Sequence, residues 1–206
     1  MTGLIEPSQP TPRNEAILQA TRELLVERGA RALTIEAVAE RAGVAKTTIY
    51  RRWASRHELA LAVVLDMVKT ASAVPELGDT RRELIEFLGR AVRILATTLM
   101  GPVMQGLVSE LASDEDLASG FRTQVVAVRV RELARVLDRG IARGQVRADV
   151  DAEQVHELLF GPVYYRLFLS GSDLDDDLAR RIVDAVYPGI ALPLGDRTTS
   201  DGHQQG

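Results

Sequence analysis

Apolar side chains recur every three to four residues over almost the whole chain, and this spacing restricts the possible folds more than any other feature of the sequence. Near the start, Ile17, Leu24 and Leu25 lie on one face of a helix when the chain is wound at 3.6 residues per turn. The sequence has no convincing apolar and polar alternation flanked by hairpin turns, which is the pattern of strands. We therefore predict an all-α fold of about nine helices.

Capping residues and helix breakers divide this pattern into segments. Gly29 is expected to end the first helix, and Thr34 to cap a short second helix that ends at Gly43. Ser55-Arg-His-Glu and Thr80-Arg-Arg-Glu both match a capping box, in which a hydroxyl and a carboxylate satisfy backbone donors. Pro188-Gly189 is expected to stop the last helix. The resulting division is a disordered tail over 1–12, a small domain over 13–56, a larger helical domain over 57–192 and a disordered tail over 193–206.

Composition excludes several classes of chemistry. The chain has no cysteine, and its three histidines are far apart in sequence, so disulfides, thiol nucleophiles and cysteine or histidine metal clusters are not expected. The acidic runs around residues 114–116 and 173–177 precede predicted helices and lack the glycine-punctuated loop of a calcium site. We expect no metal, no cofactor and no catalytic residues. An enzyme built on a helical bundle remains an alternative, but no nucleophile, base and orienting group can be assembled.

Charge is distributed unevenly along the chain. Residues 1–56 contain nine Lys or Arg against six Glu, a balance of +3, whereas the remaining residues carry −7. Between Arg41 and Arg56 there are five basic residues and no acidic one. Such a local basic segment on an acidic protein is typical of a small binding site for a polyanion. No apolar run is long enough to span a membrane and no signal peptide is recognisable, which predicts a cytoplasmic protein without a membrane partner.

The basic segment coincides with a helix-turn-helix pattern, TIEAVAERAGVAKTTIYRRWA, over residues 34–54. Ala39 is small where two helices would cross, and Gly43 permits the positive φ of a tight turn. Val38, Val44 and Ile49 are expected to fill the wedge between the helices. The outer face of the second helix then carries short polar and basic side chains suited to phosphates and to base edges in the major groove.

This segment, together with the Ser-x-x-Glu-Leu start of the next helix, resembles the DNA-binding region of the TetR family of bacterial transcriptional regulators. The ending Tyr-Arg-Arg-Trp and the distal Leu-Phe-Gly-Pro-Val-Tyr-Tyr resemble a subgroup of that family. The resemblance implies phosphate contacts from Thr34, Lys46, Tyr50, Arg52 and Arg56, and base readout by Ala45, Thr47, Thr48 and Arg51. Ala45 stands where relatives often have serine, so this side chain forfeits an N-cap hydroxyl.

The resemblance also implies an effector pocket and a dimer interface in the larger domain. The effector is an unidentified small molecule. The expected pocket lining is apolar and includes two phenols: Phe87, Leu95, Met100, Met104, Leu107, Phe121, Val125, Tyr164, Tyr165 and Phe168. The apolar stripes of the last two helices are the expected homodimer contact: Val155, Leu159, Val163, Leu178, Ile182, Val183 and Val186. These expectations describe a repressor that binds a palindromic double-stranded DNA operator and is released by its effector. The alternative is a dimeric architectural DNA-binding protein without a ligand.

Overall fold

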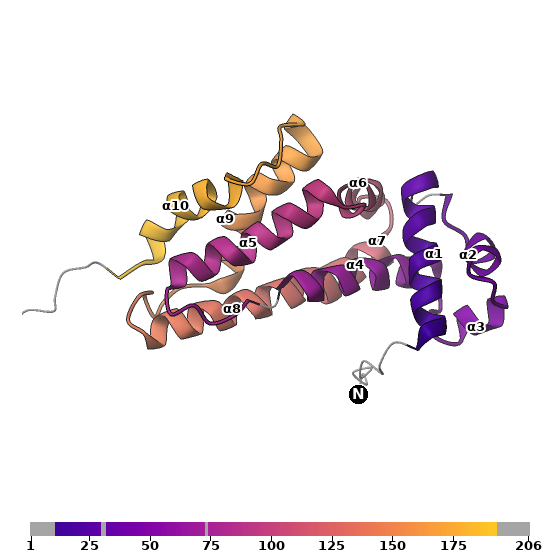
Figure 1. Ribbon diagram of the computed structural model, residues 1–206, viewed down its shortest axis with the longest axis horizontal. Helices are drawn as coiled ribbons and strands as arrows, with labels where there is room; N and C mark the ends of the chain where they lie inside the picture. Colours follow the sequence, from indigo (N-terminus) through magenta and orange to yellow (C-terminus); the bar gives the residue numbers. More distant parts are fainter. Residues whose placement is uncertain (1–10, 30–31, 73, 193–206) are drawn as a thin grey trace, which may run out of the picture.

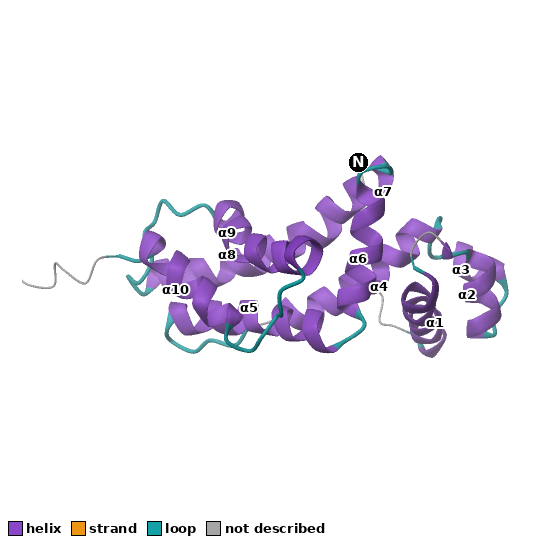
Figure 2. Cartoon of the chain, turned by 90° about the horizontal axis from the view of Figure 1, so that it is seen from above, coloured by secondary structure: helices purple, strands orange, loops and turns teal. Residues whose placement is uncertain are grey.

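The computed structural model describes residues 11–29, 32–72 and 74–192, and within them the chain is helical. The molecule is elongated, with α1, α2 and α3 at one end and the remaining helices along its length (Figure 1; Figure 2). The helices run in this order: α1 (Pro12–Arg28), α2 (Ile35–Ala42), α3 (Lys46–Tyr50), α4 (Arg56–Ser72), α5 (Thr80–Thr97), α6 (Met100–Leu111), α7 (Glu115–Gly120), η2 (Phe121–Val126), α8 (Ala127–Ala142), α9 (Ala152–Tyr165), η3 (Arg166–Ser170) and α10 (Leu178–Ile190).

Two of these helices contain wider, π-helical turns. The π-helical segment η2 joins α7 to α8 without a break, and η3 continues α9. When α7, η2 and α8 are counted as one helix, and α9 and η3 as another, the described residues form nine helices, as the sequence pattern predicts. The tails for which we expected disorder fall mostly on residues 1–10 and 193–206, which lie outside the described residues. Residues 11 and 12 differ from that expectation, because Thr11 caps α1 and Pro12 occupies its first turn.

The start and end of α2 follow from local sequence. The Thr34 hydroxyl accepts a hydrogen bond from the backbone N–H of Ala37 at 3.2 Å, as an N-cap does. Gly43 adopts φ 64° and ψ 35°, the left-handed conformation that a side chain would disfavour. The N–H of Val44 then bonds to the carbonyl of Ala39 at 3.0 Å, which satisfies the end of α2 and turns the chain into α3. The predicted helix-turn-helix is thus confirmed.

The capping box at Ser55 is confirmed in modified form, and the one at Thr80 is wrong. Ser55 accepts from the N–H of Glu58, whose carboxylate bonds to the N–H of Ala54. At α5 the N-cap is Asp79, not Thr80. Thr80 is fully buried and its hydroxyl donates to the side chain of Gln145, far along the chain. Thr80 therefore bonds to a distant partner in the core, and the neighbouring Asp79 caps the helix.

The last helix also ends later than expected. Pro188 lies inside α10, which continues to Ile190. A proline in the last turn removes only one intrahelical donor, and the helix end is held from outside. The N–H of Arg147 donates to the carbonyl of Ile190 at 2.9 Å, and Leu192 donates to Gln145 at 3.1 Å. The loop between α8 and α9 thus anchors the end of α10.

Gly140 permits the close approach of α8 to the start of α5. A Cβ atom at this position would lie 2.6 Å from Oγ1 of Thr80 and 2.8 Å from Cγ2 of Val146. We expect Gly140→Ala to lower the free energy of unfolding by about 1–3 kcal/mol through overpacking. Urea denaturation followed by circular dichroism measures this. Gly189→Ala is the control, because a Cβ there meets nothing within 4 Å, and a loss of stability equal to that of Gly140→Ala would contradict the packing argument.

Over the described residues, no single helix is long and apolar enough to cross a membrane, although α5 and α6, bent by 90° at their junction, meet the length and composition criteria as a pair.

Candidate nucleic-acid interface

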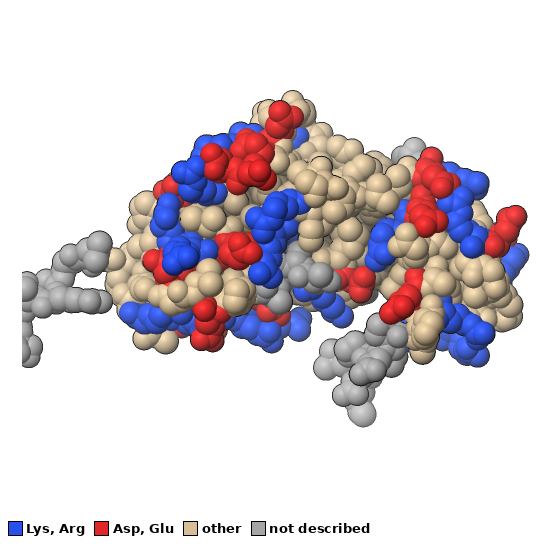
Figure 3. Space-filling model, in the orientation of Figure 1, with Lys and Arg blue, Asp and Glu red and all other residues tan. Residues whose placement is uncertain are grey.

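Helix α3 presents its outer face to solvent at one end of the molecule. Ile49 is fully buried and anchors the helix, while Thr47 and Tyr50 are exposed, Tyr50 at 51%. As the sequence indicates, Ala45 provides no side-chain cap to α3. In Figure 3, basic side chains gather at the lower edge of this end, over α3. A short helix with one buried anchor and a polar outer face has the form of a recognition helix.

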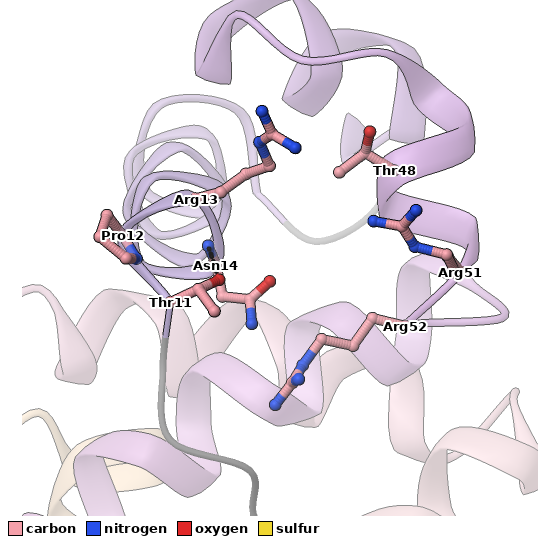
Figure 4. Close-up of a pocket in the computed structure, with 7 residues that line it drawn as sticks. All are labelled: Thr11, Pro12, Arg13, Asn14, Thr48, Arg51 and Arg52. Carbon is pink, nitrogen blue, oxygen red and sulfur yellow. Dashed lines mark hydrogen bonds between the residues drawn. The ribbon is translucent and has the colours of Figure 1, made fainter.

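An open hollow of about 580 Å³ separates α3 from the first turn of α1. In Figure 4, the side chains of Arg13, Thr48 and Arg51 extend into it from the two helices. Its complete lining is Thr11, Pro12, Arg13, Asn14, Thr48, Arg51 and Arg52, which includes three arginines and no acid. The N-terminus of α1 also directs its positive dipole to this side of the molecule (Figure 1). The hollow is therefore electropositive on both walls.

Sequence reasoning missed the α1 wall of this hollow. Arg13 is far in sequence from the basic residues in and after α3, so charge runs do not reveal it. The only local signal is Thr11-Pro12, a cap followed by a proline at the first helical position, which indicates that a helix begins there. Arg13 and Arg51 form no ion pair with any residue that the structure describes, which leaves both available to an anion.

Part of the basic segment is occupied by local ion pairs. Arg41 donates two hydrogen bonds to Glu27 at 2.6 and 2.8 Å, which tie α2 to α1 and hold the pKa of the Glu27 carboxyl below its usual value. Lys46 lies 2.7 Å from Glu36, and its hydrogen bond lowers the pKa of that carboxyl as well. Both pairs are exposed, so they are weak and exchangeable for other anions. Arg41 therefore holds α2 against α1, whereas Lys46 lies exposed at the start of α3.

Arg56 lies at the junction between the two domains. Its guanidinium is 3.7 Å from the carboxylate of Glu110 in α6, a residue that is only 5% exposed. The neighbouring His57 places Nδ1 3.1 Å from the carboxylate of Asp114, the N-cap of α7. The first turn of α4 is therefore bonded to α6 and to the start of α7, while Ser55, which caps α4, lies five residues after the end of α3.

Trp53 is buried in the core, as a structural tryptophan would be. Its exposed fraction is 7%, and the guanidinium of Arg52 lies over the ring at 5.6 Å from the centroid. This cation–π contact orients Arg52 at the end of α3. Thr34 remains exposed at the start of α2, with its hydroxyl engaged as the cap.

Most of the expected effector lining lies inside the larger domain. Seven of the ten residues are buried: Phe87, Leu95, Met100, Met104, Leu107, Phe121 and Val125. Tyr164 and Phe168 are partly buried against this core. Tyr165 differs, because it is 59% exposed and faces outward beside Gly161 and Pro162. Its placement does not support a role in an interior lining.

Most of the expected dimer residues lie inside the single chain. Six of them are buried within the single chain, with exposed fractions of 7% or less: Val155, Leu159, Val163, Leu178, Ile182 and Val183. Val186 is partly buried against the same core. The reason is that α10 packs against α5 as well as α9, so its apolar stripe has a partner within the chain. The outward face of α9 and η3 exposes other apolar residues instead, Leu158 at 50% and Leu169 at 77%.

Within the described part of the chain, no group of three or more His, Asp or Glu side chains is arranged to hold a metal ion. Asp114 accepts from the N–H of Leu117 at 2.9 Å, so this acidic run is a helix cap. Asp175 is bonded to Arg181 at 2.7 Å, a hydrogen bond that lowers the pKa of its carboxyl.

A helix-turn-helix with an electropositive hollow, joined to a larger helical domain, defines a DNA-binding transcription regulator. Comparison with known proteins gives its family. Residues 17–63 match the model of the bacterial regulatory proteins of the tetR family, and residues 74–186 match the tetracyclin repressor-like C-terminal domain. The chain belongs to the TetR family of transcriptional regulators, and it is not an enzyme.

Individual relatives resemble the chain over nearly its whole length. The HTH-type transcriptional regulator YdeS of Bacillus subtilis is 32% identical over 87% of this chain and 92% of its own. The DNA-binding transcriptional repressor TetR of Mycobacteroides abscessus is 32% identical over 88% and 95%. The crystal structure of the TetR family transcription regulator SCO0332 aligns with a TM-score of 0.74 at 32% identity, covering 87% of this chain and 98% of that one.

Proposed function

We propose that this protein is a repressor that binds a palindromic DNA operator as a homodimer and is released when a small, largely apolar effector occupies the larger domain. The observation that carries the proposal is the acid-free hollow between α1 and α3, lined by Arg13, Arg51 and Arg52. Phosphates position a protein on DNA and base contacts specify the sequence. Arg13 and Lys46 suit the first role, and Thr48 and Arg51 the second.

A second copy of the chain is required by the size of the recognition helix. Helix α3 spans five residues, which is too short for selective binding by one protomer. Two such helices related by a twofold axis would read half-sites about one helical turn of DNA apart. We propose that the partner covers the outward face of α9 and η3, where apolar residues are exposed at helical spacing: Leu158, Gly161, Pro162, Tyr165 and Leu169.

We expect Leu158→Glu to dissociate this dimer. The side chain is 50% exposed in the single chain, so the protomer should still fold while a buried carboxylate opposes association. Sedimentation velocity at micromolar concentration measures the change from dimer to monomer. The control is Glu157→Lys, which changes the charge of the adjacent exposed residue outside the stripe. A Leu158→Glu protein that remains dimeric would contradict this interface.

Helix α4 is the element through which the effector would act. It contacts α1 of the DNA-binding domain and also α5, α6, α7 and α8. The approach to α7 is tight, because a Cβ on Gly120 would lie 2.6 Å from Cδ1 of Leu61. The ion pairs of Arg56 and His57 join the same helix to α6 and α7. A ligand that favours another arrangement of these helices would shift the spacing of the two recognition helices.

The test is a DNase protection experiment with the purified protein on DNA upstream of its own gene. A repressor dimer should protect a short segment with approximate twofold symmetry, at a protein concentration that leaves flanking DNA unprotected. Uniform protection of all DNA at one threshold concentration would favour the architectural protein instead, because such a protein shows little sequence preference.

A further inference from the structure

Arg129 is a buried guanidinium without an opposite charge. The structure describes three buried charged residues, and two of them are matched: Glu83 is bonded to two arginines and Glu110 faces Arg56. Arg129, in α8, is only 4% exposed and forms no ion pair with any described residue. Its polar contact is the hydroxyl of Tyr164, 3.3 Å from one guanidinium nitrogen. A buried ion is costly unless it is paired, so the domain holds an unsatisfied preference for an anion.

A row of aromatic rings on α9 and η3 lies beside this guanidinium. His156, Phe160, Tyr164 and Phe168 follow one another at intervals of four residues, with successive ring centroids 4.6, 5.9 and 5.6 Å apart. The guanidinium carbon of Arg129 lies 4.7 Å from the centroid of Phe160. The row therefore places four neighbouring aromatic rings together, with one positive charge beside Phe160.

His156 provides a second polar atom at the same place. The residue is 6% exposed, and its buried Nε2 atom has no hydrogen-bond partner among the residues that the structure describes. Burial, together with the charge of Arg129, lowers the pKa of His156 to about 4, so the imidazole is neutral near pH 7. A buried nitrogen without a partner near an unpaired guanidinium leaves two polar groups that one ligand atom group would satisfy together.

We propose that the effector of this regulator is a carboxylic acid whose carboxylate pairs with Arg129, with His156 and Tyr164 as its other polar contacts and its apolar body against the aromatic row. This inference rests on the proposed function, since it names the chemical class of the effector. The site holds one positive charge, from Arg129, because His156 is neutral. A carboxylate of charge −1 matches that charge, and a phosphate ester of about −1.5 to −2 exceeds it.

The position of the site connects it to the rest of the molecule. Arg129 is in α8, which packs against α4, and η2 immediately before it also contacts α4. An anion that draws Arg129 toward His156 would alter the packing of α8 on the helix that begins at the DNA-binding domain. Binding of a carboxylate and release of DNA would thus both act through α4.

The experiment is calorimetry and thermal unfolding of the full-length protein without DNA. The probes are benzoate, phenylacetate, hexanoate and decanoate, each compared with its uncharged primary amide and, for hexanoate, with hexyl phosphate. We expect at least one acid to bind and raise Tm, its amide to bind at least tenfold more weakly, and hexyl phosphate to bind more weakly than hexanoate. Arg129→Met should remove the binding of the acid, and Tyr164→Phe should weaken it. Arg131→Met, an exposed arginine two residues away on α8, should leave it unchanged.

Stability without ligand separates a binding role of Arg129 from a structural one. If the guanidinium awaits an anion, its replacement by an apolar side chain of similar length should raise Tm by about 2–4 °C. A lower Tm for Arg129→Met would show that Arg129 supports the fold and would overturn the proposal. So would equal binding of acids and amides, stronger binding of hexyl phosphate, or no binding by any acid of the panel. Each of these results would leave selective operator binding by the wild-type protein intact, so only the effector proposal would fail. If the wild-type protein did not bind an operator selectively, the proposed function would fail instead.

Discussion

Replacing Glu83 by alanine is expected to lower the free energy of unfolding by about 3–5 kcal/mol, the range for breaking a buried ion pair on one side. The Glu83 side chain is fully buried and accepts hydrogen bonds from Arg139 and Arg143, each at 3.1 Å. It also accepts from the backbone N–H groups of Leu77 and Gly78. Its removal takes this acceptor from Arg139, Arg143 and two backbone donors where α5, α8 and the preceding loop meet, although Arg143 keeps its hydrogen bonds to Thr80 and Gln145.

Urea denaturation of both proteins measures this change. Glu86→Ala on the same helix is the matched control, because Glu86 pairs with Arg90 at 2.6 Å but its side chain is 33% exposed. That change should cost no more than about 1 kcal/mol. Equal effects of the two substitutions would show that the buried network does not stabilise the domain.

The same network gives a pH dependence. Burial alone would raise the pKa of the Glu83 carboxyl, but the hydrogen bonds from Arg143, Leu77 and Arg139 outweigh it and hold the pKa below the ordinary value of 4.5. A depressed folded-state pKa stabilises the protein above 4.5, and this contribution disappears as the pH falls below 4.5 through the folded-state pKa. The stability difference between the wild-type protein and Glu83→Ala should therefore shrink in that acidic range.

Arg51→Ala is expected to weaken operator binding by about tenfold or more per half-site while changing affinity for random DNA much less. An arginine on a base edge contributes about 1–3 kcal/mol of discrimination, and the dimer carries two copies. Thr48→Ala should relax sequence preference in the same direction. Competition binding with operator and scrambled duplexes measures the ratio of the two affinities.

Two other arginines at the same end of the molecule serve as comparisons. Arg13→Ala should weaken binding to both duplexes alike and reduce the slope of log affinity against log salt by about one for each phosphate that the protein no longer neutralises. Arg28→Ala, an exposed arginine in the last turn of α1, away from the hollow, should change neither. If Arg51→Ala weakened both duplexes equally, Arg51 would bind a phosphate and would not be a base reader.

Features encoded by neighbouring residues were predictable from the sequence. The all-α class follows from apolar spacing, and the ends of α2 follow from Thr34 and Gly43, whose capping roles depend on a few adjacent residues. The exposed face of α3 was likewise predictable, since Ile49 is the residue that its pattern buries. Each of these depends on interactions within about one or two helical turns.

Features that depend on distant partners were not predictable in this way. An apolar stripe such as Leu178, Ile182 and Val183 shows that a helix has a packing partner, but not that the partner is α5 of the same chain. Thr80 has the sequence of a cap, yet Gln145 binds it across 65 positions. Arg129 resembles its exposed neighbours in the sequence, and only the packing of α8 on α9 reveals that it is buried.

We propose that the hollow between α1 and α3 reads a specific DNA sequence. Fluorescence anisotropy with the protected upstream segment and a scrambled duplex of equal length, across a salt series, tests it most directly. We expect affinity for the operator to exceed that for the scrambled duplex by at least about 10³-fold near physiological salt, and this ratio to persist as both affinities fall with salt. Equal affinities at every salt concentration would contradict the claim and favour a protein that holds DNA through phosphates alone.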